Sequence, residues 1–434
     1  MPPIKHRHFA LLAIGLLVAT LISSTIIQTA SAANAHSFNP SNIIDDTVFT
    51  NKDSMSVSQI QAFLNSKVTC DTMGLKTSEL GGGTRAQWLA ANGISVPITC
   101  INGYYENPAT GANNYGKSSI PSGAISAAQI IYNYSFQFNI NPQVIIVTLQ
   151  KENGLITDEW PTPRQYTQAM GFGCPDNVAP GAPACDPTYK SFSTQIYQAA
   201  RHFRGYIDRD YCDANWCTPK TTGNNTILWN PSSSCGSSVV NIQNRATVAL
   251  YSYTPYRPNP NALIAGYGTG DSCSSYGNRN FYLYFTDWFG STYAPDFSAQ
   301  SVWQQVYTDN TKTTALGWNA NLVAGQSAYA VVAMKNTGNM TWTNSGAFGV
   351  TDTRLATSAP WGRQSAFCDP TWIISCTRPA TLKEASVAPG QYGTFEFAIK
   401  APSQPGSYAE SFAPIVDGRT VFSNGGMGIG LNVK

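Results

Sequence analysis

The sequence predicts a multi-domain protein in which a mostly α-helical domain precedes an all-β sandwich. The chain has 434 residues, which is enough for two or three domains. From Ile125 to about Ser291, apolar residues recur at the spacing of amphipathic helices. After Ala294-Pro295 the pattern changes to the alternation and frequent turn signals of a β-sandwich. This change of period marks the boundary between the two domains.

Residues 1–32 have the features of a signal peptide. Lys5 and Arg7 precede a run without charge over residues 9–27, and two small-residue cleavage sites follow, Ala30-Ser31-Ala32 and Ala33-Asn34-Ala35. The alternative is an uncleaved membrane anchor, because an apolar run of this length can span a bilayer. Polar residues 23–25 and the Ala-x-Ala sites favour cleavage. We therefore expect a secreted or cell-surface protein that has no membrane contact after cleavage.

Residues 33–117 form an N-terminal lead-in region before the helical domain. Its clearest element is a capped amphipathic helix over residues 54–67, with Val57, Ile60, Phe63 and Leu64 on one face. Residues 106–119 are rich in Gly and Asn and indicate a loop. We assign no chemistry to this region.

The helical domain is predicted over residues 118–293, with helices at 127–138, 142–153, 191–207 and 239–252. A linker over residues 294–300 leads to the β-sandwich at 301–434. The stretch 394–400 alternates apolar and polar residues, as a half-buried strand does. Turn signals recur at Pro389-Gly390 and Pro405-Gly406.

The chain contains ten cysteines, an even number that in an exported protein indicates disulfides. Their spacing favours pairing between near neighbours, although spacing alone leaves the connectivity open. A zinc site is the competing interpretation, and it lacks a second close pair and histidine partners. The expected pairs are Cys70 with Cys100, Cys174 with Cys185, Cys212 with Cys217, Cys235 with Cys273, and Cys368 with Cys376.

Histidine content and charge exclude several classes of function. Of four histidines, His6 and His8 lie in the signal peptide, which leaves His36 and His202. This argues against serine hydrolases, cysteine amidases and zinc peptidases, and His202 suits packing better than base catalysis. Removing Lys5 and Arg7 from the 26 basic residues leaves 24, equal to the 24 acidic ones. A neutral chain without basic runs is not expected to bind nucleic acid, and no metal or cofactor is predicted.

Glu152 is the strongest candidate for chemistry. Pro142 and Gly154 suit the two ends of a helix over residues 142–153. Ile145, Leu149 and Glu152 then share one stripe, which predicts that the carboxyl lies on the buried face. An apolar setting favours a protonated carboxyl, as a general acid for glycosidic cleavage requires. The alternative is an ordinary solvated glutamate at a frayed helix end.

Residues 141–155 resemble the catalytic helix of the lysozyme-like superfamily, in its lytic transglycosylase branch. The resemblance continues in residues 169–174, which match the stretch that lines the sugar cleft, and in residues 249–254, which match a later tyrosine motif. It implies that Glu152 is the acid/base and that no second protein carboxylate is needed. Asn153, Gly173-Cys174 and Thr254 replace a serine, Met-Gln and an asparagine of the family pattern. The implied substrate-binding residues are Asn153, Gly171, Phe172, Tyr253 and Tyr256.

The helical domain also resembles exported bacterial proteins labelled "hemagglutinin". The β-module resembles the four-tryptophan immunoglobulin-like domain, through residues 331–342, 387–390 and 401–408. The four tryptophans would be Trp318, Trp342, Trp361 and Trp372. That likeness implies a module that binds a surface protein or a glycan, or acts as a spacer. We therefore expect a secreted glycosidase or lytic transglycosylase that cleaves cell-wall glycan, with a non-catalytic adhesin or glycan-binding protein as the alternative.

Overall fold

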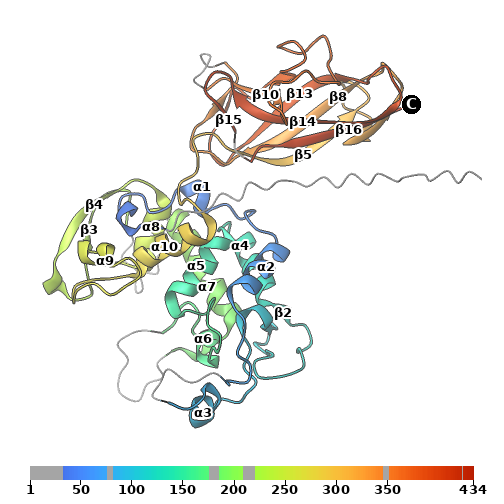
Figure 1. Ribbon diagram of the computed structural model, residues 1–434. Helices are drawn as coiled ribbons and strands as arrows, with labels where there is room; N and C mark the ends of the chain where they lie inside the picture. Colours follow the sequence, from blue (N-terminus) through green and yellow to red (C-terminus); the bar gives the residue numbers. More distant parts are fainter. Residues whose placement is uncertain (1–32, 76–81, 175–184, 209–219, 346–350, 423) are drawn as a thin grey trace, which may run out of the picture.

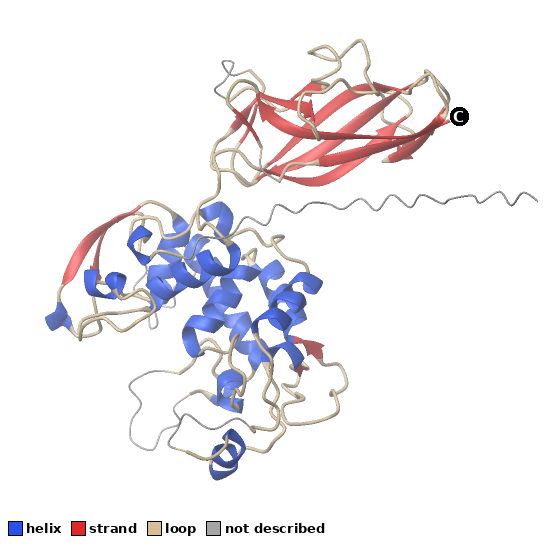
Figure 2. Cartoon of the chain, in the orientation of Figure 1, coloured by secondary structure: helices blue, strands red, loops and turns tan. Residues whose placement is uncertain are grey.

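The protein is described by a computed structural model that covers residues 33–75, 82–174, 185–208, 220–345, 351–422 and 424–434. It consists of a helical body followed by a β-module (Figures 1 and 2). Each part has its own cluster of buried apolar side chains. The chain therefore contains both helices and sheets, in two separate cores.

The helical body also contains short strands. Its helices are α1 (Asp46–Phe49), α2 (Val57–Lys67), α3 (Arg85–Ala91), α4 (Ala127–Gln137), α5 (Pro142–Asn153), α6 (Pro163–Thr167), α7 (Phe192–Asp208), α8 (Arg245–Tyr253), α9 (Pro260–Ile264) and α10 (Gly277–Phe289). Four one-turn 3₁₀ segments are η1 (Ala35–Ser37), η2 (Ile101–Gly103), η3 (Pro187–Tyr189) and η4 (Ser233–Cys235). The strands pair as β1 (Tyr105–Glu106) with β2 (Ile125–Ser126), and β3 (Gly223–Leu228) with β4 (Ser237–Ile242).

Helix α5 lies at the centre of the body and carries the candidate glutamate. It packs against α4, α7 and α10, and its residues from Val144 to Gln150 are all buried. The Asn141 side chain accepts a hydrogen bond from the Gln143 N–H, which caps the first turn. Gly154 ends the helix in the left-handed conformation at φ 73°. The predicted bounds of this helix are confirmed.

The lead-in region belongs to the same core as the helices that follow it. Ile43, Phe49, Ile60 and Leu64 are fully buried in one cluster with the apolar face of α5. The predicted helix at 54–67 is present as α2, and Ser56 and Gln59 form a reciprocal capping box at its start. The described parts of the lead-in region at 35–68 and 100–104 therefore contribute to the core of the helical body.

The helix predicted over 239–252 is wrong in its first half. Strand β4 takes up residues 237–242 and pairs with β3, with Gly223 opposite Ile242. Helix α8 starts only at Arg245, after the Asn244 side chain accepts a hydrogen bond from the Thr247 N–H. The Asn244 cap stops the helix from extending backwards, so the residues before it are available to the hairpin.

The β-module consists of two large facing sheets and one small sheet in which β9 pairs with β12. Its strands are β5 (Ala299–Tyr307), β6 (Ala315–Gly317), β7 (Asn319–Leu322), β8 (Ser327–Asn336), β9 (Trp342–Thr343), β10 (Thr353–Thr357), β11 (Ala380–Thr381), β12 (Ser386–Val387), β13 (Tyr392–Lys400), β14 (Gly406–Val416), β15 (Thr420–Val421) and β16 (Met427–Val433). One sheet has the order β13-β8-β5-β6, and the other has β11-β10-β14-β16-β7, with β15 beside β14. Phe397 and Phe412, one from each sheet, meet edge to face at 5.4 Å. The alternating strand predicted at 394–400 is confirmed within β13.

The module begins slightly earlier than the sequence indicates. Strand β5 starts at Ala299, and Phe297 is already buried in the β-module core, so the predicted linker 294–300 is shorter. Of the four tryptophans singled out in the sequence, Trp342 and Trp372 are buried, whereas Trp318 and Trp361 are exposed. Only the buried pair supports the core.

Four of the five predicted disulfides are confirmed. Cys70–Cys100, Cys174–Cys185, Cys235–Cys273 and Cys368–Cys376 are bonded. Cys212 and Cys217 lie outside the described residues, as does the predicted signal peptide. Within the described ranges, none of the helices combines the length and the apolar composition that crossing a membrane requires.

Candidate functional site

Glu152 lies in the last turn of α5, where the helix emerges from the core. Ile145 and Leu149 are fully buried, as the predicted stripe requires, but the Glu152 side chain is 28% exposed to solvent. The prediction that Glu152 lies on the buried face is therefore wrong. The helix ends at Asn153, the residue after Glu152, and Gly154 caps it, so that Glu152 lies in the last turn of the helix.

The closest partner of Glu152 is the preceding residue, Lys151. Its ammonium lies 2.5 Å from the Glu152 Oε1 and donates to the Thr254 hydroxyl at 3.0 Å. The same nitrogen lies 4.8 Å from the centre of the Tyr253 ring. The Lys151 side chain is only 3% exposed, so the cation is held between the ends of α5 and α8 and fixes one carboxylate oxygen in place.

Tyr253, at the end of α8, lies beside Glu152 as the sequence predicts for a shared site. Its hydroxyl donates to the Met170 carbonyl at 2.8 Å, and its ring packs on Phe203 with centroids 4.8 Å apart. Burial is the main cause that raises the pKa of the Tyr253 hydroxyl well above its usual value, and the nearby Glu152 carboxylate and Tyr206 raise it further. The hydroxyl therefore stays protonated and links α8 to the turn after residue 169.

Gln195 of α7 shapes the turn that contains Gly171 and Phe172. Its Oε1 accepts hydrogen bonds from the Met170 and Phe172 N–H groups at 3.1 Å, and its Nε2 donates to the Phe172 carbonyl at 2.8 Å. Gly171 adopts the left-handed conformation at φ 70° and is exposed. Buried Gln195 is a site-shaping residue that the sequence pattern missed, because it lies on an otherwise ordinary helix face.

The Phe172 side chain is half-buried against two rings. It meets Tyr189 at 4.7 Å and the His202 imidazole at 5.0 Å. Burial lowers the pKa of His202, with a hydrogen bond to the Gln198 carbonyl opposing that shift. His202 therefore packs against the candidate site, in line with the role that its sequence context favours.

Asn153 and Tyr256 are held by structural contacts. The Asn153 amide donates to the Gln165 carbonyl at 2.9 Å, and Gln165 returns a bond to the Asn153 carbonyl at 3.1 Å. The Tyr256 carbonyl accepts from Asn278 at 2.8 Å, and its backbone bridges to Leu228. Tyr256 is therefore held by β3 and α10. None of its described contacts is with Glu152, which interacts with Tyr253 instead.

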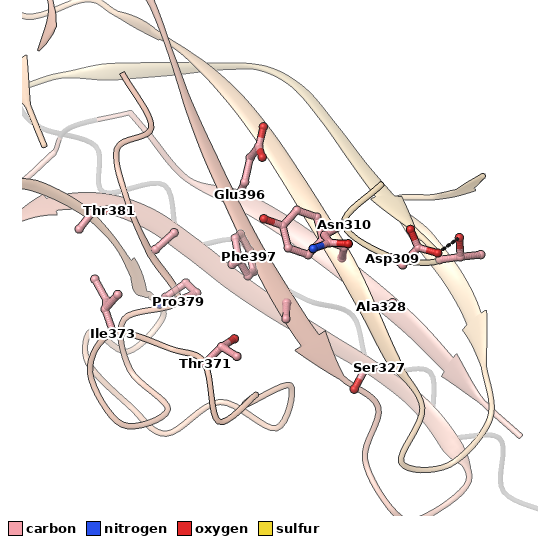
Figure 3. Close-up of a pocket in the computed structure, with 14 residues that line it drawn as sticks. Asp309, Asn310, Ser327, Ala328, Thr371, Ile373, Pro379, Thr381, Glu396 and Phe397 are labelled. Atoms are coloured by element: carbon pink, nitrogen blue, oxygen red, sulfur yellow. Dashed lines mark hydrogen bonds between the residues drawn. The ribbon is translucent and has the colours of Figure 1, made fainter. Parts of the chain in front are cut away.

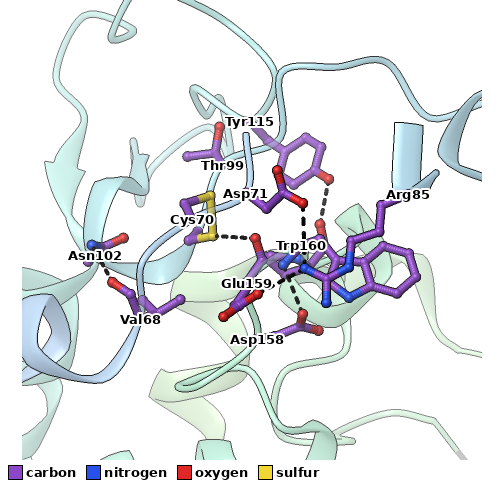
Figure 4. Close-up of a disulfide and its surroundings, with 12 residues drawn as sticks. Val68, Cys70, Asp71, Arg85, Thr99, Asn102, Tyr115, Asp158, Glu159 and Trp160 are labelled. Carbon is purple, nitrogen blue, oxygen red and sulfur yellow. Dashed lines mark hydrogen bonds and ion pairs between the residues drawn. A yellow bond between two sulfur atoms is a disulfide. The ribbon is translucent and has the colours of Figure 1, made fainter. Parts of the chain in front are cut away.

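The other carboxylates near this part of the chain have structural partners. Asp158 accepts hydrogen bonds from the Trp160 N–H and from Gln165, and Glu159 forms an ion pair with Arg85 at 2.9 Å. Figure 4 shows the Arg85, Glu159 and Trp160 side chains close to the Cys70–Cys100 disulfide. Glu159 thus fixes the lead-in region to the body, whereas Asp158 holds the segment around Trp160 and Gln165.

The β-module carries a second candidate site, a groove of about 540 Å³ along β8 and β13 (Figure 3). Tyr329, Glu396 and Asn310 line it from the strands and an adjoining turn, and Thr371 and Ile373 line it from a neighbouring loop. Glu396 is bracketed by two ammonium groups, those of Lys312 at 3.0 Å and Lys383 at 2.5 Å. Its charge is therefore balanced within the protein.

Backbone groups along the open edge of β13 are largely occupied. The Thr394 carbonyl accepts the Lys383 N–H at 2.8 Å, the Ala398 carbonyl accepts the Trp372 indole at 2.7 Å, and the Lys400 N–H donates to the Phe367 carbonyl. An extended peptide could not pair along this edge without displacing these contacts. The groove is therefore better suited to a ligand that contacts side chains.

No known family model matches the chain, and no curated protein matches it significantly. The functional assignment therefore depends on the geometry of these sites.

Proposed function

We propose that this chain is a secreted enzyme that cleaves glycosidic bonds between amino sugars of the cell wall, as a lytic transglycosylase or a related glycosidase. One observation carries the proposal: Tyr253 interacts with Glu152 and also donates a hydrogen bond to the Met170 carbonyl, directly before Gly171 and Phe172, so that it links three distant parts of the sequence. A partly exposed carboxyl near an aromatic ring is suited to meeting a sugar ring and acting on its glycosidic oxygen.

In the proposed step, the Glu152 carboxyl would donate a proton to the glycosidic oxygen as the bond from that oxygen to the anomeric carbon breaks. A hydroxyl of the same sugar, or a water molecule, would then bond to the anomeric carbon and return a proton to the Glu152 carboxylate, which the Lys151 ammonium stabilises in the meantime. Lys151 holds Oε1, so we assign the transfer to Oε2. Asp158 and Glu159 are engaged elsewhere, which supports a mechanism with one protein carboxylate. Phe172 and Tyr253 would position the sugar rings, and Lys151 would hold the carboxyl in a fixed direction.

The test is digestion of purified peptidoglycan by the wild-type protein and by Glu152→Gln. General acid catalysis contributes about 10²–10⁴-fold, so the variant should release fragments at least about 100-fold more slowly. Mass spectrometry of the fragments distinguishes anhydro ends, made by a transglycosylase, from reducing ends, made by a hydrolase. Equal rates for the two proteins would show that another residue is the acid.

A second candidate function, glycan binding by an adhesin without cleavage, is favoured by the groove in the β-module. The groove combines the aromatic ring of Tyr329 with polar side chains, and Glu396 is already neutralised by two lysines. A neutral saccharide offers the matching hydroxyl groups and apolar ring faces. The same groove would hold the enzyme on its substrate if the chain is catalytic.

Binding of the full-length Glu152→Gln protein to insoluble peptidoglycan tests the groove without cleavage. Tyr329→Ala should weaken binding about tenfold, the equivalent of about 1.4 kcal/mol. Tyr392→Ala is the matched control, because Tyr392 is an exposed aromatic on β13 that does not line the groove. If wild type releases no fragments and Tyr329→Ala alone loses binding, the adhesin function is supported. Equal binding by both variants would remove the groove from the proposal.

A further inference from the structure

Ala33, the first residue that the structure describes, forms a hydrogen bond with a residue far along the sequence. The Ala33 backbone nitrogen donates to the Asp287 Oδ1 at 2.6 Å, across 254 positions of sequence. Ala33 packs against the core of the helical body. The other Asp287 oxygen accepts the Tyr267 hydroxyl at 2.6 Å. The carboxylate is therefore held in place by α10 and its surroundings, with Oδ1 directed to Ala33.

The residues after Ala33 are already part of the fold. Ala35 is 4% exposed, and the Asn34 side chain caps η1 by accepting the His36 N–H at 3.0 Å. Phe38 packs edge to face on Tyr282 of α10. A cut after Ala35 would remove the cap, a buried side chain and the bond to Asp287. A cut after Ala32 would leave all three in place.

We infer that processing occurs between Ala32 and Ala33, and that Asp287 is the receptor for the new amino terminus. The inference rests on the proposed export of the chain. Hydrolysis by a signal peptidase adds water across this peptide bond, leaving a carboxylate on Ala32 and an ammonium group on Ala33. That ammonium is formed 2.6 Å from a carboxylate oxygen, so a neutral hydrogen bond becomes a charge-assisted one.

These contacts of Ala33, Asn34 and Ala35 favour the first of the two small-residue cleavage sites over the second. Cleavage after Ala30-Ser31-Ala32 falls directly before Ala33, whereas cleavage after Ala33-Asn34-Ala35 falls inside the fold.

The pairing of the Ala33 amino group with Asp287 also makes the stability of the protein depend on whether that amino group is charged. Lys67 of α2 and Tyr267 interact directly with Asp287, and Tyr284 and Arg279 interact in turn with Tyr267. Burial and the bond to Asp287 raise the pKa of Tyr267, and burial lowers that of Lys67.

The first experiment is expression of the full chain in an export-competent bacterium, with intact-mass analysis and amino-terminal sequencing of the exported protein. We expect a start at Ala33. A start at His36 or any other residue would overturn the inference and leave the proposed export intact. An uncleaved chain that stays in the cytoplasm would overturn both, whereas an uncleaved chain anchored in the membrane would overturn this inference alone.

The second experiment compares a chain that starts at Ala33 with one that carries an added Gly before it. The added Gly keeps the Ala33 N–H donor but moves the charge one residue away. Pairing raises the pKa of the amino group above its usual value of about 7.7–8.0, so its stabilisation is present below that range and is lost as pH rises through the raised pKa. We expect the Ala33 chain to melt about 2 °C higher at pH 6.5, with the gap closing by pH 9.5 or above.

Lys67 is common to both chains, so its titration cancels in this difference. Asp287→Asn should abolish the gap at pH 6.5, whereas Asp296→Asn, which changes a largely exposed acid of the β-module, should leave it unchanged. No gap at pH 6.5, or a gap that persists in Asp287→Asn, would show that Asp287 does not receive the amino terminus.

Discussion

Glu106 shows how a residue in a predicted loop can hold two parts of the body together. It is 1% exposed, and its carboxylate accepts hydrogen bonds from the Tyr104 hydroxyl and from the N–H groups of Phe192 and Ser193. The last two are at the start of α7, so a side chain from the lead-in region caps a helix 86 positions away. Nothing in the composition of residues 106–119 indicates this role.

Removing this carboxylate should destabilise the protein strongly. Glu106→Ala leaves the two N–H groups and two hydroxyls without their acceptor in a buried site, so we expect the free energy of unfolding to fall by about 3–5 kcal/mol. Glu106→Gln should cost less, because one acceptor oxygen remains. Urea denaturation measures both, with Asp296→Ala as an exposed control expected within about 0.5 kcal/mol of wild type. A loss below about 1 kcal/mol for Glu106→Ala would contradict the capping role.

At the scale of elements, the helix that carries Glu152 was predictable because its signals are local. Asn141, Pro142 and Gly154 mark its ends, and the apolar run Val144–Val147 and Leu149 lie between them. Helix α10 ends at a glycine, Gly290, but has no capping side chain at its start, and it depends on burying aromatic residues such as Phe281 and Phe285. The exposure of Glu152 and its contact with Lys151 were also out of reach, because they depend on where neighbouring elements stop.

Gly154 provides a direct test of how the helix end positions Glu152. Its φ of 73° is disfavoured for residues with a Cβ, although a Cβ there would meet no atom within 4 Å. Gly154→Ala should therefore cost about 1 kcal/mol through backbone strain alone. Gly154→Asn should cost less, because asparagine tolerates this conformation. Thermal unfolding measures both, and a cost for Asn equal to that for Ala would argue against the strain.

The same pair of variants links the element to the proposed chemistry. If the cap fixes the last turn, cleavage of peptidoglycan by Gly154→Ala should fall more than cleavage by Gly154→Asn. Gly173→Ala combines the same backbone strain, since Gly173 also has a positive φ of 70°, with a clash, because its Cβ would lie 2.7 Å from the Tyr189 ring beside Phe172. It serves as a variant that damages the site through a steric clash.

At the scale of the whole molecule, the sequence indicated two parts with a boundary near residue 294, and the structure has two separate cores. The sequence, however, did not indicate how the two parts are joined. The junction depends on Asp45, which accepts hydrogen bonds from the Asn42 side chain, the Ala294 N–H and the Asn339 side chain at 2.7–2.9 Å. One buried carboxylate thus connects the lead-in region, the linker and the β-module.

Asp45→Asn should loosen this junction while leaving both cores folded. The Asp45 Oδ2 accepts from both Ala294 and Asn339, and Oδ1 accepts from Asn42. An amide offers one oxygen, so its NH₂ must face a donor on one side, and at least one of the three contacts is lost. We expect a larger radius of gyration in small-angle scattering, faster proteolysis near residue 295, and a loss of about 1–3 kcal/mol confined to the junction. Asp53→Asn is the control, since its contact with Lys335 across the junction is 4.0 Å and partly exposed. An unchanged radius and unchanged cleavage near residue 295 in Asp45→Asn would show that the Asp45 contacts do not hold the two parts together.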